Sequence, residues 1–140
     1  MAKQPINVTA ATLTVDRDNH AGTVVTVNRA AGCTITLPAS IGKGDEYTFY
    51  VGTTITSNSF IIKVANSSDT MAGGVSISTD IAGITMLAGG TNDTITMSGS
   101  TTGGVAGSWV TLKDVAANVW MVNGFLCSTG TEATPFSATV

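Results

Sequence analysis

The sequence predicts an all-β fold, an antiparallel β-sandwich or jelly-roll-like barrel of about nine or ten short strands with an extended N-terminal arm. Polar and apolar residues alternate in many short runs, as in strands that turn one face to a core. Clusters of turn-forming residues separate these runs at intervals of about eight to twelve residues. Roughly one residue in six is threonine, whose β-branched side chain suits a pleated sheet.

The first 28 residues predict an arm followed by a hairpin. Residues 1–7 form the expected arm, because Pro5 keeps the residue before it extended. Residues 8–15 and 23–28 alternate in polarity, as paired strands do. Residues 16–22 between them bond readily to their own backbone or tolerate left-handed angles. We expect these two runs to pair as a hairpin.

Residues 32–65 predict three strands joined by two tight connections. Alternation or apolar runs mark the strands, and Pro38 ends the first of them because it cannot donate to a sheet ladder. The strands cover residues 34–37, 47–51 and 60–64. In the middle strand we expect one face to be buried, made of Tyr47, Phe49 and Val51, with Thr48 and Tyr50 on the other face.

The rest of the chain predicts shorter strands and a C-terminal tail. Residues 80–90 fit a strand or a short helix equally well. Residues 109–113 and 119–123 predict a final hairpin, and residues 125–140 a tail with one short strand. Further strands are expected at residues 71–78 and 94–98. No fixed period runs through the chain, so a β-solenoid is not expected.

Size and composition limit the classes of partner. A chain of 140 residues predicts a single β-domain over residues 1–140. The net charge is −3 and the six Lys and Arg are dispersed, so we expect no binding to nucleic acid or to a membrane surface. Only 11% of residues are charged, which predicts a neutral surface that fits assembly with other protein and an ordinary β-domain equally well. The N-terminus lacks the apolar segment of a signal peptide, and we expect synthesis in a cytoplasm.

Residues that could support catalysis are sparse. His20 is the sole histidine, and no Gly-x-Ser-x-Gly motif accompanies it. Residues 16–20 resemble the start of a calcium loop, but Ala21 and Val27 stand where that loop needs glycine and glutamate. Asp45 and Glu46 are adjacent and point to opposite faces of a strand, so they cannot act as a glycosidase pair. We expect no enzyme, no cofactor and no metal site.

Three stretches resemble small structural proteins of tailed bacteriophages, and most of all the capsid decoration, or cement, proteins. They are residues 14–73, which include TITLPA and YTFYVGTTITS, residues 93–126, and residues 130–137. This resemblance implies a homotrimer on the outer surface of the expanded head. It also implies that the major capsid protein is the partner, that capsomer contacts are stabilised, and that the host cytoplasm is where the chain is made.

The resemblance also suggests where contact occurs. An extended end that pairs with a capsid strand gains affinity from backbone hydrogen bonds. The candidate capsid-contact residues are Lys3, Gln4, Pro5, Ile6 and Asn7. The same sequence motifs occur in phage fibre proteins. The alternative is therefore a tail-fibre or head-fibre module that binds a host glycan or another virion protein. That module would place Trp109, Trp120 or Tyr50 on an exposed site.

Overall fold

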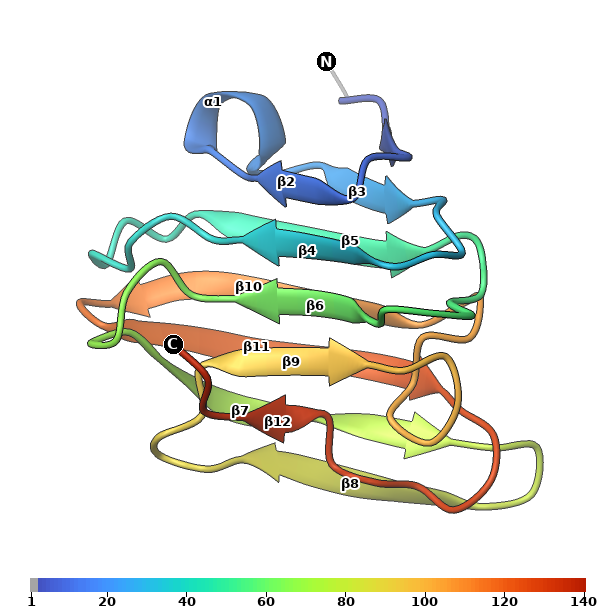
Figure 1. Cartoon of the computed structure of the whole chain (residues 1–140). Coiled ribbons are helices and arrows are strands. Elements are labelled where there is room, and N and C mark those ends of the chain that lie inside the picture. The colour runs from blue at the N-terminus through green and yellow to red at the C-terminus, as the bar shows by residue number, and fades with distance from the viewer. Residues whose placement is uncertain (1–2) are drawn as a thin grey trace.

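The computed structural model describes residues 3–140 and has an all-β fold of two stacked sheets (Figure 1). The larger sheet has seven strands in the order β1 (Ile6–Val8), β3 (Val24–Val27), β5 (Glu46–Val51), β10 (Trp109–Ala116), β11 (Val119–Cys127), β7 (Thr70–Ser78), β8 (Gly83–Ala88). The smaller sheet has five, in the order β12 (Phe136–Ser137), β9 (Thr94–Met97), β6 (Phe60–Lys63), β4 (Cys33–Thr36), β2 (Thr12–Thr14). One helical turn, α1 (Arg17–His20), lies at the edge beside β2 and β3.

The core lies between the sheets and follows the period-2 pattern of the strands. As predicted, Tyr47, Phe49 and Val51 are fully buried, whereas Tyr50 is 39% exposed. Phe49 of the larger sheet meets Phe60 of the smaller one edge to face, with ring centroids 6.5 Å apart. Burying such rings supplies much of the apolar contact that holds two sheets together.

The prediction of an antiparallel arrangement is wrong for the first half of the chain. Strands β1 to β6 alternate between the two sheets, so β1, β3 and β5 are parallel neighbours in one sheet and β2, β4 and β6 in the other. Residues 8–15 and 23–28 therefore do not form a hairpin, and residues 32–65 do not form a meander. Each turn carries the chain across the sandwich, over the roughly 10 Å between packed sheets, and does not fold it back in the same sheet.

The crossing from β2 to β3 shows how local chemistry produces this arrangement. Asp16 is the N-cap of α1, and its Oδ1 accepts a hydrogen bond from the backbone N–H of Asn19 at 2.8 Å. This bond satisfies a helix N–H that would otherwise lack a partner. The short helix then directs the chain from β2 in the smaller sheet to β3 in the larger one.

The second half is closer to the prediction. β10 and β11 form the expected hairpin, turned at Asn118 with a φ of 63°, and a register shift falls between Asp114 and Ala116. Residues 80–90, where strand and helix were both open, contain β8. The total of twelve strands exceeds the prediction, partly because residues 8–15 contribute to two short strands, β1 and β2, and the C-terminal segment pairs as β12.

The chain is tied to the sheets from Lys3 onward and again in its C-terminal segment. Ile6 and Asn7 belong to β1, and the Lys3 ammonium donates to the Ala21 carbonyl at 2.6 Å. The N-terminal arm expected for residues 1–7 is thus attached from Lys3 onward, while residues 1–2 lie outside the described residues. In the C-terminal segment, Phe125–Cys127 complete β11 and Phe136–Ser137 form β12.

Buried carboxylates hold the crossing loops. Asp114 in β10 is 3% exposed. Its Oδ1 accepts from the Ser40 hydroxyl at 2.8 Å and from the Gly42 N–H at 2.6 Å, and its Oδ2 from the Lys43 N–H at 3.0 Å. Burial alone would raise the pKa of Asp114, but these hydrogen bonds outweigh it and the pKa is lowered.

Asp114→Asn is expected to lower the free energy of unfolding at pH 7 by roughly 1–3 kcal/mol, because an amide cannot accept all the N–H groups that the carboxylate accepts. The lowered pKa in the folded state means that the carboxylate stabilises the fold above its unfolded pKa of about 3.9. That contribution is lost as the pH falls through the folded pKa. Urea unfolding from neutral to acidic pH should therefore give a flatter profile for the variant than for wild type.

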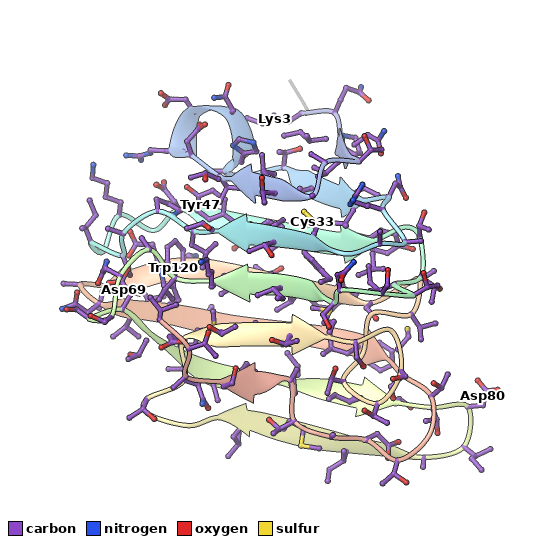
Figure 2. All side chains as sticks on the ribbon, viewed as in Figure 1. Lys3, Cys33, Tyr47, Asp69, Asp80 and Trp120 are labelled. Atoms are coloured by element: carbon purple, nitrogen blue, oxygen red, sulfur yellow. The ribbon has the colours of Figure 1, made fainter. Side chains whose placement is uncertain are left out.

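The matched control is Asp80→Asn. Asp80 is exposed in the turn after β7, at the opposite end of the sandwich from Asp69 (Figure 2). Asp80→Asn should leave both the free energy of unfolding and its dependence on acid pH unchanged. Equal effects of the two substitutions would contradict the role given to Asp114.

Gly32, which leads into β4, is required by close approach of the backbone. Its φ is +80°, and a Cβ there would lie 2.8 Å from the Ser57 carbonyl oxygen and closer still to that of Ser59. Gly32→Ala should therefore cost at least about 2 kcal/mol of stability, from the left-handed angle and the clash together. Gly44 has a φ of +76° with open space around it, so Gly44→Ala should cost only about 1 kcal/mol. Thermal unfolding of both variants separates the cost of the left-handed backbone angle from the cost of the steric clash. Similar losses of stability in the two variants would show that the structure around residue 32 shifts and relieves the clash.

Candidate interaction surface

The residues considered above for catalysis lie apart. His20 is 9% exposed, and its Nδ1 accepts from the Asp16 backbone N–H at 3.0 Å, so it stabilises the α1 turn. Asp45 forms an ion pair with Arg17, with Nε 3.0 Å from Oδ1. Within residues 3–140, no three His, Cys, Asp or Glu side chains converge to hold a metal ion.

The two cysteines are free and differ in burial. Cys33 is buried and Cys127 half-buried. Burial raises the pKa of the Cys33 thiol, which keeps it protonated and unreactive at neutral pH.

The aromatic residues divide between the core and one surface. Trp120 is fully buried and packs edge to face on Tyr47, with ring centroids 5.8 Å apart. It therefore cannot form the exposed site that a fibre module would need. Trp109, by contrast, is half-buried and stands directly opposite Tyr50 on one neighbouring strand and Phe125 on the other. Tyr50 and Phe125 are 39% and 40% exposed. The three side chains form a row on the outer face, meaning the side of the seven-stranded sheet that faces away from the smaller sheet.

The outer face carries very little charge. The seven strands contain three charged residues, Glu46, Lys113 and Asp114, and Asp114 points into the protein. Glu46 and Lys113 are paired opposite each other across β5 and β10. The face is therefore close to neutral, with apolar side chains among hydroxyls such as Thr48 and Thr111, whose oxygens lie 2.9 Å apart.

Apolar exposure is greatest toward β8. Leu87 is 75% exposed and Met121 42%, and both line a shallow groove of about 440 Å³ over β7, β8 and β11. Gly74 lies opposite Leu87 in the register and keeps the floor of the groove low. In the adjoining turn, Ile81 is 97% exposed. Sequence reasoning missed this surface, although the alternation of Met121, Asn123 and Phe125 in β11 already placed apolar groups on its outer side.

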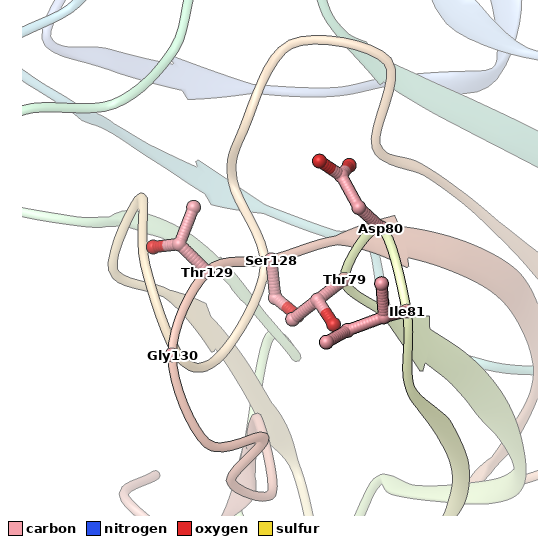
Figure 3. A pocket seen from close by; sticks show the side chains of 6 residues that line it. All are labelled: Thr79, Asp80, Ile81, Ser128, Thr129 and Gly130. Atoms are coloured by element: carbon pink, nitrogen blue, oxygen red, sulfur yellow. The ribbon is translucent and has the colours of Figure 1, made fainter.

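A second hollow lies at the β7–β8 turn. It has a volume of about 460 Å³ and is lined by hydroxyl groups, the carboxylate of Asp80 and the side chain of Ile81 (Figure 3). Ser128 closes one side, and its backbone N–H donates to the Ser78 carbonyl at 2.9 Å. The lining has no basic group and no histidine, so it provides hydrogen-bonding groups but no proton-transfer pair.

The predicted capsid-contact residues lie at the far edge of the larger sheet from β8. Lys3, Gln4 and Pro5 are exposed and lead into β1, whose outer side has no neighbouring strand among the described residues. Asn7 accepts from the Asn28 side chain at 2.8 Å, which fixes the strand to β3 and the loop after it. The segment thus presents an open strand edge.

In the part of the chain that the structure describes, no helix has the length and apolar character needed to cross a membrane. Comparisons with protein-family models, with curated proteins and with solved structures found no match.

Proposed function

We propose that this chain is a bacteriophage capsid decoration protein, a homotrimer that binds the major capsid protein on the outer surface of the expanded head. The observation that carries the proposal is the almost uncharged outer face, with exposed Tyr50, Met121 and Phe125. Such a face suits packing against protein rather than nucleic acid or an anionic membrane. The resemblance of residues 14–73 to phage decoration proteins supports the capsid as the partner.

The mechanism is mechanical. A rigid β-body with its loops held by buried hydrogen bonds can bridge neighbouring capsomers and resist the outward pressure of packaged DNA. Three linked copies multiply a weak contact into a stable one. The open edge of β1, with Lys3 to Asn7 at its start, provides a place where a capsid strand adds to the sheet.

Purified protein is expected to bind expanded capsids and to raise their resistance to heat and to chelators, as measured by light scattering and by release of packaged DNA. The compact precursor should bind less, since its subunits are arranged differently. If neither binding nor protection is seen, the capsid role is wrong.

The β1 edge can be tested with Lys3→Glu, which we expect to weaken capsid binding roughly tenfold, because a modest loss at each contact is multiplied in a trimer. Lys43→Glu changes the net charge equally, and Lys43 lies in the exposed loop between β4 and β5, away from β1. Co-sedimentation with capsids should separate the two variants. Equal binding by both would place the capsid contact elsewhere.

A second candidate function is a head-fibre or tail-fibre module that binds a glycan, which the row of Tyr50, Trp109 and Phe125 favours. Aromatic faces flanked by hydroxyls are suited to stacking on sugar rings. Glycan-array binding that falls at least about tenfold in Trp109→Ala, but not in Val115→Ala, would support this function. Val115 is 46% exposed and lies near the end of β10, whereas Trp109 of the aromatic row lies at its start. Absence of any glycan signal from the wild-type protein would exclude it.

A further inference from the structure

The two sheets have four edge strands, and they differ sharply in protection. β1 and β2 have three residues each, and β12 has two. Pro5 precedes β1, Pro135 precedes β12, and α1 follows β2. Short length, proline and a covering helix limit the length of the ladder that an edge can form with another chain, so β1 offers a short pairing at most.

β8 has none of these devices. It has six residues, Gly83–Ala88, with no charge and no proline. Its one neighbour is β7, so the N–H and C=O groups along its other side have no strand partner among the described residues. The nearest charged residues along the chain are Asp80 and Asp93, both outside the strand.

β8 also extends beyond the cover that the smaller sheet provides. Ile84 stands opposite Ile77, which is fully buried, so the two side chains point to the same inner side of the sheet. Yet Ile84 is 51% exposed, because β12 at the end of the smaller sheet has two residues and does not reach over it. The inner side of β8 is thus open at Ile84, beside an unpaired backbone edge, whereas Met86 and Ala88 on the same side pack against the core.

We propose that β8 pairs with β8 of a second copy of this chain, antiparallel about a two-fold axis. An isologous contact needs a surface that complements itself, and an antiparallel pair of identical strands meets that need because each edge supplies the donors and acceptors that the other lacks. With the axis at Thr85, Ile84 faces Met86 of the partner subunit. The absence of charge in the strand means that two copies meet without repulsion.

The pairing has two consequences. The two seven-stranded sheets become one continuous sheet, and the exposed Ile84 of each copy gains cover from the inner side of its partner. The inference goes beyond the proposed capsid role and does not depend on it. Trimers paired through β8 would contain six copies, and chains that pair without forming trimers would contain two.

Thr85→Lys tests the proposal, because Thr85 is exposed and two lysines directly opposite each other repel. Light scattering after size exclusion, over a range of concentrations, should give an even number of copies for wild type. We expect the variant to weaken the association at least tenfold and to halve that number. Thr12→Lys makes the same change on the edge strand β2 and should leave the mass unchanged.

Mixing two oppositely charged variants distinguishes loss of pairing from loss of folding. Thr85→Lys and Thr85→Glu should each fail to pair alone, and an equal mixture of the two should pair again, which an unfolded variant could not do. A wild-type mass of one or three copies at all concentrations would overturn the proposal, as would a mass that Thr85→Lys leaves unchanged. Either result leaves the capsid-binding measurements to decide the proposed function separately.

Discussion

The arrangement of the strands depends on a buried cluster around Ser40. Its hydroxyl donates to Asp114 and lies within hydrogen-bond distance of the carbonyls of Ala116 and Val119, while its backbone N–H donates to Asp69. These contacts join the β4–β5 crossing, the β10–β11 hairpin and the start of β7. Segments far apart in sequence thereby meet at one point, which fixes how the alternating first half packs on the antiparallel second half.

The burial of acidic residues also explains why the outer face carries so little charge. Several of the few acidic residues are used inside the protein, since Asp69, Asp93 and Asp114 are all buried. Asp93 accepts from the Thr94 hydroxyl and from the backbone N–H of Thr139, which holds the C-terminus against β9. Because these carboxylates stabilise loops, few remain to solvate the outer face. A neutral, partly apolar exterior is thus the counterpart of a fold whose loops are held by buried carboxylates.

The sequence predicted local structure better than strand order. Period-2 alternation identified the strands of residues 34–37, 47–51 and 60–64, and it correctly placed Tyr47 and Phe49 in the core. It could not tell which sheet each strand joins, because a turn that folds back and one that crosses the sandwich use the same Asp, Asn and Gly residues. The choice depends on distant partners such as Ser40 and Asp114. The outer face and the β8 edge were missed for the same reason, since a strand becomes an edge only when the whole strand order is known.

Strand order also explains why the unprotected edge lies at β8 and not elsewhere. Strands β1 to β6 join the two sheets alternately, one strand at each crossing, so this half of the sandwich adds three strands to each sheet. The second half does not, because the hairpins β7–β8 and β10–β11 both enter the larger sheet, while β9 and β12 alone extend the smaller one. The larger sheet therefore extends beyond its cover at one end. The exposed Ile84 and the open backbone of β8 follow from this inequality, and the second half of the chain, with its two hairpins, produces a surface that another sheet edge can complete.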